Sequence, residues 1–487
     1  MTNIRPLTIL HSNDMHGDFL EEEVNGVKTG GLSRLSGYVK HVRETEESVI
    51  YAIAGDMFRG SIIDSEYLGL STIELVNLMR PDVTCIGNHE VDYGIAHLLF
   101  LEKCARFPII NANLFVTLNN TRLFTPYLNV DINGMRVLFI GILTEEVIAS
   151  TKGEKVIGTF IDVDEAAREV GIICDNYRTK DTDITILLTH IGLDEDRKLA
   201  QALSPDLGVD FIVGGHSHSY MEKPEIVNGI PIVQAYTGTD IVGRFDIRYD
   251  TENGEIVDWK WSVVPINEKT ADIDSIMEEL VSRYKDQTDL KYHRVVTRLK
   301  RKLTHPARNM ETEQGNLYAD ILQDESSFDV MFMASGSIRK PEFGPIVEYQ
   351  DMMENTPFDD ALWMISLTGD QFRKVILHLL RDEAWEGHTE FYQVSKGVHI
   401  VYHKTGHVLE ECTFNGTPVE QLEKITCAIQ DYHFRSFDEF FGIPIEEVKK
   451  NMKPRMVATS VNNIIEEYLS THPDLDARVE GRITVLD

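Results

Sequence analysis

The sequence predicts an α/β protein of two domains, and three observations support this prediction. The first half alternates short apolar runs with amphipathic stretches, an order that is typical of strands and helices in one α/β domain. The pattern changes near residue 271, and the second half carries an apolar helical stripe of its own. A length of 487 residues is enough for two or three domains.

Seven apolar runs in the first half are expected to be buried strands, because each is short and rich in β-branched residues. Amphipathic helices are expected between several of these runs. The expected strands cover residues 7–10, 49–54, 83–86, 108–112, 137–143, 184–188 and 211–213. The expected helices cover residues 71–79, 95–104, 164–177 and 195–203.

The pattern of apolar residues along the sequence changes at about residue 271. Apolar residues from Ile273 to Tyr284 share one face of a helix. We therefore expect a helical connector at 271–295, between a first domain at 1–270 and a second domain at 296–487.

Two further segments of the second half have a recognisable pattern. The basic cluster at 291–302 could be a nucleic-acid-binding patch. The alternation of its side chains instead favours a strand with one face exposed to solvent. The stripe from Phe372 to Leu380 predicts a helix that begins with Thr368 or Asp370 as its N-cap. A last helix is expected at 456–469.

Charge and composition exclude several classes of partner and location. Lys and Arg number 47 against 79 Asp and Glu, which gives a formal charge of −32. This balance argues against a nucleic acid polymer or an anionic membrane as partner, although one site can still bind a small anion. The five cysteines are odd in number and include no CxxC, which favours reduced thiols. No leader and no apolar run of ~18 residues is visible, so we expect a cytoplasmic protein.

Five short polar segments each follow an expected strand. Because ligands gather at the carboxyl ends of strands in open α/β sheets, these segments are expected to converge on one site. Mixed Asp, Asn and His side chains suit borderline or hard divalent ions such as Zn, Mn, Fe or Mg. The segments are Ser12-Asn13-Asp14-Met15-His16-Gly17, Gly55-Asp56-Met57-Phe58-Arg59-Gly60-Ser61, Gly87-Asn88-His89-Glu90, Leu188-Thr189-His190 and Gly214-Gly215-His216-Ser217-His218.

The spacing inside these segments has a physical reason. Asp14 and His16 are two residues apart, and so are His216 and His218. Residues two apart in extended chain point the same way, so each pair can reach one region of space.

This set of segments resembles the calcineurin-like metallophosphoesterase superfamily. Within it, the set is similar to the 5′-nucleotidase family, which includes bacterial UDP-sugar hydrolases and cyclic-nucleotide phosphodiesterases. The resemblance covers nearly the whole chain. It implies an N-terminal four-layer αββα sandwich with two mixed sheets, and a C-terminal α+β substrate-binding domain of the 5′-nucleotidase type.

The resemblance also implies two divalent metal ions, drawn from Mn, Zn, Mg, Co or Fe, with Asp56 as a shared ligand. Two ions that share a carboxylate can clamp a phosphoryl group and activate a water that bridges them. By motif, one site matches Asp14, His16, Asp56 and His218, and the other matches Asp56, Asn88, His190 and His216.

His89 is left without a metal in this scheme, because it is adjacent to Asn88 and the two side chains point apart. It can stabilise the transferring phosphoryl group or help the leaving oxygen depart. Asp92 follows three residues later and can hold the imidazole in one tautomer, as in the family's His–Asp pair.

The resemblance places the substrate-binding residues in the second domain. Arg308 precedes a segment that looks like the family's GNLxAD helix start, and Arg339 ends a loop that looks like its NGGGIR, with two residues replaced by Ser. Phe358, in Pro357-Phe358, matches a ring that stacks on the nucleobase. Tyr432 is the candidate for the second stacking ring.

The expected function is a dinuclear metal-dependent phosphoester hydrolase, foremost a 5′-nucleotidase acting on nucleoside monophosphates. The alternatives are a 2′,3′-cyclic-nucleotide phosphodiesterase or nucleotide-sugar hydrolase, a non-catalytic nucleotide-binding sensor, and a C-terminal half that acts as an interaction module. The family's Gly-Gly-Asp-Gly is replaced here by residues 433–442, whose phenylalanines predict a helix packed on the core or else a remodelled base pocket.

Overall fold

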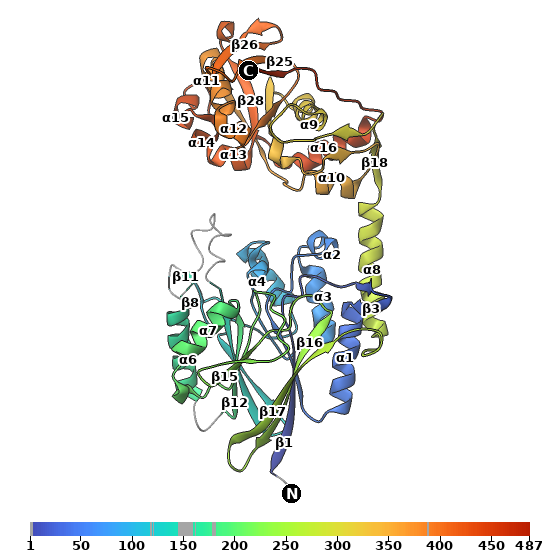
Figure 1. Ribbon diagram of the computed structural model, residues 1–487, viewed down its shortest axis with the longest axis vertical. Coiled ribbons are helices and arrows are strands. Elements are labelled where there is room, and N and C mark those ends of the chain that lie inside the picture. The colour runs from blue at the N-terminus through green and yellow to red at the C-terminus, as the bar shows by residue number, and fades with distance from the viewer. Residues whose placement is uncertain are drawn as a thin grey trace. The chain divides into compact units, whose positions relative to one another are not determined.

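The computed structural model describes residues 3–116, 119, 121–144, 159–160, 162–177, 182–386 and 389–487. The chain divides into two compact units, Met1–Thr288 and Asp289–Asp487 (Figure 1). The helix α8 (Ser275–Tyr292) crosses this boundary. Met277 and Val281 of α8 pack into the core of the N-terminal unit, so most of the stretch expected to be a connector belongs to that unit.

The N-terminal unit contains two six-stranded sheets, and both are mixed, as the family resemblance implied. In the first sheet, four strands are parallel neighbours, and β16 and β17 are antiparallel to the strands they pair with. Its order is β17 (Glu255–Pro265), β16 (Ile241–Asp250), β1 (Ile4–Ser12), β4 (Val49–Ala54), β5 (Val83–Cys85) and β6 (Ile109–Ile110).

The second sheet is also parallel at its centre, but it has one antiparallel strand at each edge. Its order is β14 (Glu225–Val227), β15 (Ile230–Val233), β13 (Phe211–Val213), β12 (Ile184–His190), β10 (Met135–Leu143) and β9 (Tyr127–Ile132). Each of the seven apolar runs expected to form a strand overlaps one of these strands.

The two sheets pack face to face, because Ile9 and Phe245 of the first sheet share a core with Phe139 and Ile186 of the second. Helices cover the two outer faces, with α1 and α3 on the first sheet and α6 and α7 on the second (Figure 1). The four-layer αββα sandwich is therefore confirmed. The helices of this unit are α1 (Leu32–Thr45), α2 (Ile62–Glu66), α3 (Leu70–Met79), α4 (Ile95–Cys104), α6 (Val163–Tyr177) and α7 (Leu193–Ala202).

Small sheets of two or three strands complete the N-terminal unit and the start of the C-terminal one. A hairpin joins β2 (Glu21–Val24) to β3 (Val27–Gly30), and β11 (Thr159–Phe160), β7 (Leu114–Val116) and β8 (Thr121–Arg122) form a short sheet. In the C-terminal unit, β19 (Leu303–Thr304) pairs with β21 (Glu342–Phe343).

The C-terminal unit is built on two sheets with helices packed against them. Thr368 is the N-cap of α11, where it forms a capping box with Gln371. The sheets are β24 (Tyr392–Val394), β20 (Val330–Ala334), β28 (Ile425–Gln430), β23 (Leu362–Leu367) and β29 (Arg455–Ala458), and β27 (Thr417–Pro418), β26 (Val408–Phe414), β25 (Val398–His403) and β30 (Ile483–Leu486). The helices are α9 (Glu313–Asp324), α10 (Tyr349–Asn355), α11 (Gly369–Leu379), α12 (Asp382–Glu386), α13 (Asp431–Arg435), α14 (Phe437–Phe441), α15 (Ile445–Val448) and α16 (Val461–Thr471).

Two predictions for the second half are wrong in detail. Only β18 (Val295–Arg298) forms in the basic cluster, paired with β22 (Ile346–Glu348) across a register shift. The shift exposes Val295 and buries its neighbours Val296 and Thr297, so the expected alternation fails. The last helix begins at Val461 rather than near 456, because Ser460 caps it and the residues before it form β29.

Residues 433–442 form parts of two short helices that pack on the core. Phe437 and Phe441 are buried, with their rings stacked. Phe434 and Phe440 are partly buried against the same cluster. The phenylalanines of this segment therefore serve the core, which was one of the two interpretations of the sequence.

Among the described residues, no helix combines the length and the apolar character needed to cross a membrane.

A close backbone approach in the N-terminal unit gives a stability prediction. A Cβ atom on Gly37 of α1 would lie 1.9 Å from the backbone oxygen of Asp272, whereas one on Gly171 of α6 would lie 3.7 Å from a methyl carbon of Leu207. Gly37→Ala should therefore lower the free energy of unfolding by about 1–3 kcal/mol. Gly171→Ala, the matched helix substitution, should raise it by up to about 1 kcal/mol. Urea denaturation checks both, and equal effects would contradict the close approach.

Candidate metal centre

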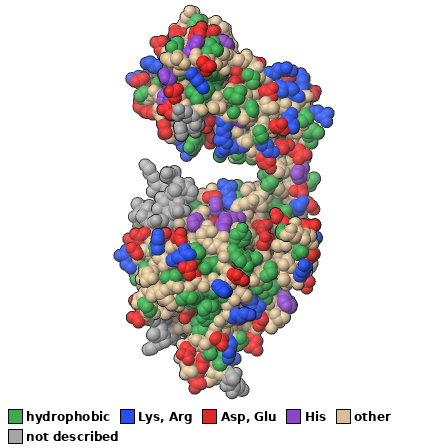
Figure 2. Space-filling view, viewed as in Figure 1, with side chains coloured by type: hydrophobic (Ala, Val, Ile, Leu, Met, Phe, Trp, Pro, Cys, Tyr) green, Lys and Arg blue, Asp and Glu red, His purple; other side chains and the backbone are tan. Residues whose placement is uncertain are grey.

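Metal-capable side chains gather where the strands of both large sheets end. The strands β1, β4, β5, β12 and β13 lead directly into the five polar segments. Figure 2 shows histidine side chains grouped on one face of the N-terminal unit. Within each of three groups, the ligand atoms lie within 4.8 Å of one another: Asp14, His16 and His218; Asp56, His190 and His216; and His16, Asp56 and His89.

The centre is built around two buried carboxylates. Asp14 and Asp56 are 0% and 2% exposed. The Nε2 atom of buried His190 lies 3.0 Å from Asp56 Oδ2 and 3.8 Å from Asp14 Oδ1. Although burial opposes it, the carboxylate of Asp56 raises the pKa of His190 to about 10. The two carboxylates thus require positive charge beside them, which a divalent ion would supply.

Backbone carbonyls orient two of the imidazole rings. His16 donates from Nδ1 to Arg59 O at 3.0 Å, and His190 donates from Nδ1 to Ala54 O at 2.8 Å. In each ring Nε2 is then the nitrogen that faces the carboxylates, and it can offer a lone pair to a metal ion that takes the place of a proton there. His218 Nε2 lies 3.0 Å from His16 Nε2 and 3.3 Å from Asp14 Oδ1, so the donors of the first group meet at one point.

The second group closes around an amide oxygen. Asn88 Oδ1 lies 3.2 Å from His190 Nε2 and 2.7 Å from His216 Nδ1. The carboxylate of Asp56 meets the same His190 nitrogen. The structure thus brings together all the side chains expected to bind metal, namely Asp14, His16, Asp56, Asn88, His190, His216 and His218.

Five of these residues have a left-handed backbone. The φ angles are 51° for Asp14, 50° for His16, 52° for Asp56, 78° for His216 and 48° for His218. Such a conformation costs roughly 1–3 kcal/mol at a residue other than glycine and persists only where the surroundings impose it. Asp, Asn and His tolerate it better than most residues, and strain of this kind clusters at functional sites.

Glu90 is a supporting residue to which the sequence analysis gave no role. Its carboxylate is 1% exposed and accepts hydrogen bonds from Asp56 N at 3.0 Å, Met57 N at 2.6 Å and Gly87 N at 2.6 Å. Burial, followed by the charge of Asp56, raises the pKa of Glu90 to about 7. Glu90 thus ties the loop of Asp56 to the loop of Asn88, and its place in Gly87-Asn88-His89-Glu90 is the signal that could have found it.

Gln234 holds the loop of His216 and His218 in a similar way. Its Oε1 accepts from Ser217 Oγ at 2.9 Å and from Ser219 N at 3.2 Å, and its Nε2 donates to Gly215 O at 3.1 Å. This glutamine follows β15 outside every segment singled out in the sequence, so no local signal could have indicated it.

His89 lies beside the centre, next to Asp92 and Arg59. Its Nδ1 lies 2.7 Å from Asp92 Oδ2, and Arg59 Nε donates to the same oxygen at 3.1 Å. The hydrogen bond to Asp92 raises the pKa of His89 against the opposing effect of burial. The rings of His89 and His16 have centroids 5.2 Å apart. His89 therefore borders the ligand cluster, and Asp92 fixes its orientation.

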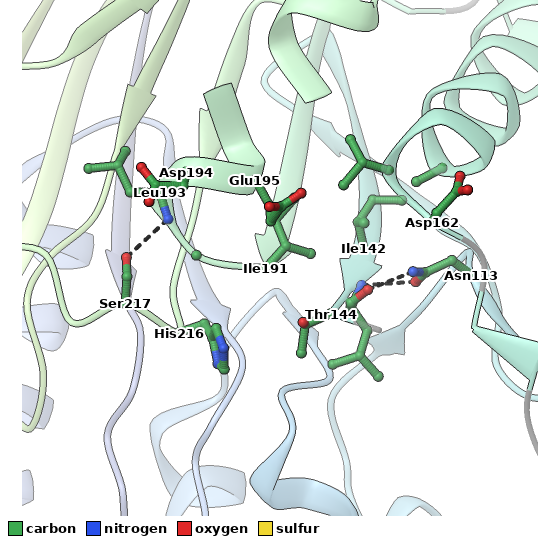
Figure 3. A pocket seen from close by; sticks show the side chains of 14 residues that line it. Asn113, Ile142, Thr144, Asp162, Ile191, Leu193, Asp194, Glu195, His216 and Ser217 are labelled. Atoms are coloured by element: carbon green, nitrogen blue, oxygen red, sulfur yellow. Dashed lines mark hydrogen bonds between the residues drawn. The ribbon is translucent and has the colours of Figure 1, made fainter. Parts of the chain in front are cut away.

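A cavity of about 290 Å³ adjoins the centre on the side of His216. It lies between the ends of β10 and β12 and the first turns of α6 and α7, and its lining includes Ile142, Asp194 and Glu195 (Figure 3). Ser217 accepts a hydrogen bond from Leu193 N at its edge. This side of the centre has room for part of a small molecule.

In the C-terminal unit, the four expected substrate-binding residues are all exposed to solvent. Phe358 is 43% exposed and Tyr432 is 64% exposed. The guanidinium carbon of Arg339 lies 4.8 Å from the centroid of the Phe358 ring. Nearby, Glu390 accepts a hydrogen bond from Gly336 N at 2.7 Å, and the sequence analysis gave no role to this carboxylate. Phe358 and Arg339 form one surface that a ligand can reach.

Both halves of the chain match family models. The calcineurin-like phosphoesterase model matches residues 7–220, and the model of the 5′-nucleotidase C-terminal domain matches residues 295–443. The chain thus joins a calcineurin-like phosphoesterase domain to a 5′-nucleotidase C-terminal domain. It is a metal-dependent phosphoester hydrolase, which agrees with the ligand groups at its strand ends.

Relatives and solved structures match along nearly the whole chain. "Protein 5NUC" of Lutzomyia longipalpis is 28% identical, over 99% of this chain and 93% of its own. The 5′-nucleotidase of Mus musculus is 25% identical, over 98% of this chain and 90% of its own. The crystal structure of a 5′-nucleotidase precursor from Thermus thermophilus is similar, with a TM-score of 0.58, 24% identity, and coverage of 99% of this chain and 100% of that chain.

The three hydrogen bonds of Glu90 predict a metal-binding defect in Glu90→Gln. The amide has one oxygen where the carboxylate has two, and its NH₂ group would face a backbone N–H. The loops of Asp56 and Asn88 should then lose their common anchor, and metal affinity should fall about 10- to 100-fold. Metal titration by calorimetry checks this, with the surface variant Glu102→Gln as control. Unchanged affinity in Glu90→Gln would contradict the supporting role.

Proposed function

We propose that this enzyme is a 5′-nucleotidase that releases phosphate from nucleoside monophosphates. The observation that carries the proposal is the combination, in one chain, of the ligand cluster around Asp56 with the exposed Arg339–Phe358 surface of a 5′-nucleotidase C-terminal domain. Full-length relatives that are named 5′-nucleotidases support it. The fold alone would not support this function, because a sulfate thiohydrolase from T. thermophilus has a similar fold, with a TM-score of 0.55 and 16% identity.

Two divalent ions would be held by the two sets of ligands. Asp14, His16, Asp56 and His218 would hold one, and Asp56, Asn88, His190 and His216 would hold the other. Oxygen and imidazole donors without a thiolate fit Mn, Zn, Mg, Co or Fe. When bound, such ions supply positive charge to the phosphoryl group and a nucleophile at neutral pH. A cytoplasmic location stays a prediction from the sequence.

His89 is proposed as the group that assists departure of the alcohol. Asp92 holds the Nδ1–H of the ring, so Nε2 is the nitrogen left to face the substrate. In hydrolysis, the oxygen of water forms a new bond to phosphorus and gives up a proton to solvent, the bond to the leaving oxygen breaks, and that oxygen takes up a proton. A protonated His89 can give this proton from Nε2. Alternatively, it can stabilise the negative charge on the phosphoryl oxygens before the alcohol leaves.

The C-terminal unit is proposed to bind the nucleoside. Phe358 and Tyr432 offer flat rings to a base, and stacking of this kind is worth roughly 1–3 kcal/mol per base. Arg339, which lies over the Phe358 ring, and Arg308 add positive charge to this unit. Cyclic nucleotides and nucleotide sugars remain alternative substrates.

The role of His89 predicts a defect in turnover without a defect in metal binding. His89→Ala should keep both ions and lower kcat about 10²- to 10⁴-fold, the range for a lost acid–base group. Turnover assays and elemental analysis of the same samples check this, with the exposed His41→Ala of α1 as control. Loss of an ion in His89→Ala would instead make His89 a ligand, as its closeness to His16 and Asp56 allows.

The proposed base site predicts a defect that depends on the substrate. Phe358→Ala should raise KM for AMP by about 5- to 100-fold, because stacking is lost. Hydrolysis of p-nitrophenyl phosphate should stay unchanged, since this ester has no base. Steady-state kinetics on both substrates check this, and Phe100→Ala, an exposed phenylalanine of α4, is the matched control. An unchanged KM for AMP would show that nucleotides do not bind through Phe358.

A further inference from the structure

Arg59 is an unusual part of the loop that carries Asp56. Its backbone is left-handed, with φ at 64°. Its N–H donates to Asp64 Oδ2 at 2.8 Å, and its carbonyl accepts from His16 Nδ1 at 3.0 Å. Asp64 is fully buried. The backbone of Arg59 is thus anchored on one side and orients an expected metal ligand on the other.

The side chain of Arg59 is held in place on two sides. Its Nε donates to Asp92 Oδ2 at 3.1 Å, the same oxygen that His89 Nδ1 contacts at 2.7 Å. Its guanidinium carbon lies 4.9 Å from the centroid of the Tyr93 ring. The guanidinium therefore lies beside His89 at the edge of the ligand cluster, and a stacked, hydrogen-bonded arginine has little freedom left to lose on binding.

The terminal nitrogens of Arg59 remain available to an anion. The side chain is 43% exposed. Among the described residues, Asp92 is the carboxylate that pairs with Arg59, and it does so through Nε. A guanidinium presents its nitrogens as a rigid fork that matches the oxygens of a phosphate. Nothing in the proposed function uses this charge.

We propose that Arg59 binds a non-bridging oxygen of the substrate's phosphoryl group and makes this centre selective for phosphomonoesters over phosphodiesters. A monoester carries nearly two negative charges at neutral pH, since its second pKa is about 6. A diester carries one, so a fixed cation stabilises the monoester more. The inference rests on phosphoester hydrolysis at this centre, but not on a nucleotide as the substrate.

The first test compares two esters with the same leaving group, p-nitrophenyl phosphate and bis(p-nitrophenyl) phosphate. In Arg59→Gln, the ratio of kcat/KM for monoester over diester should fall about 10- to 100-fold, the range for a hydrogen bond to a charged group. Arg59→Lys should keep part of the ratio, because it keeps the charge and loses the fork. Arg80→Gln is the matched control: Arg80 is also exposed and left-handed, with φ at 53°, and it caps α3.

The second test needs no turnover. Binding of inorganic phosphate to the metal-loaded protein is measured by calorimetry, with metal content determined on the same samples. Arg59→Gln should bind phosphate about 10-fold or more weakly with both ions retained, and Arg80→Gln should bind it like the parent.

The outcomes separate this inference from its rivals. If Arg59 acted only by positioning Asp92 and His89, both esters would slow equally and phosphate affinity would stay the same, which would overturn the proposal. Loss of metal in Arg59→Gln would also overturn it. If the parent protein hydrolysed aryl phosphates but not AMP, the proposed nucleotidase function would fail while the Arg59 result still stood.

Discussion

The burial of two negative charges, Asp14 and Asp56, is the constraint on which the rest of the N-terminal unit depends. Both carboxylates lie almost out of contact with water where strands of two different sheets end. Isolated charges at such depth would be strongly destabilising. In the sandwich, nitrogen atoms of His16, His190 and His218 lie beside the two carboxylates and offset this cost. The face-to-face packing of the sheets makes this possible, because β1 and β12 carry their ligands to a common edge.

Much of this centre could be predicted because its signals are local. Asp14, His16 and Asp56 each stand within a few residues of an apolar run, and the end of a buried strand tells where the following side chains must gather. Glu90 was visible in the sequence, but its three bonds to backbone N–H groups of two loops were not. Gln234 depends on a loop that precedes it and on strand neighbours in β15, so its role arises only in three dimensions.

The second half was predicted less well for a related reason. Arg455–Ala458 became β29 because it pairs with β23, about ninety residues earlier in the chain, and a short segment with Met and Ala is compatible with a helix as well. Val295 is exposed because a register shift intervenes in the pairing of β18. The helix at Gly369–Leu379 was predicted correctly because its stripe and its cap are contained within it. Long-range pairing overrides local preference at strand edges more than inside amphipathic helices.

The left-handed backbone at five of the seven side chains expected to bind metal limits how this centre can change in evolution. At φ near +50° a β-branched residue is strongly disfavoured by sterics, and Gly, Asn, Asp and His reach the conformation more easily than other residues. An exchange to Glu, Gln or Cys would have to overcome backbone strain before it could contribute a donor. At these five positions, single substitutions that cost the backbone little therefore exchange one oxygen or imidazole donor for another. At these five positions the backbone geometry therefore favours oxygen and imidazole donors over a cysteine thiolate, and with them the harder and borderline metals.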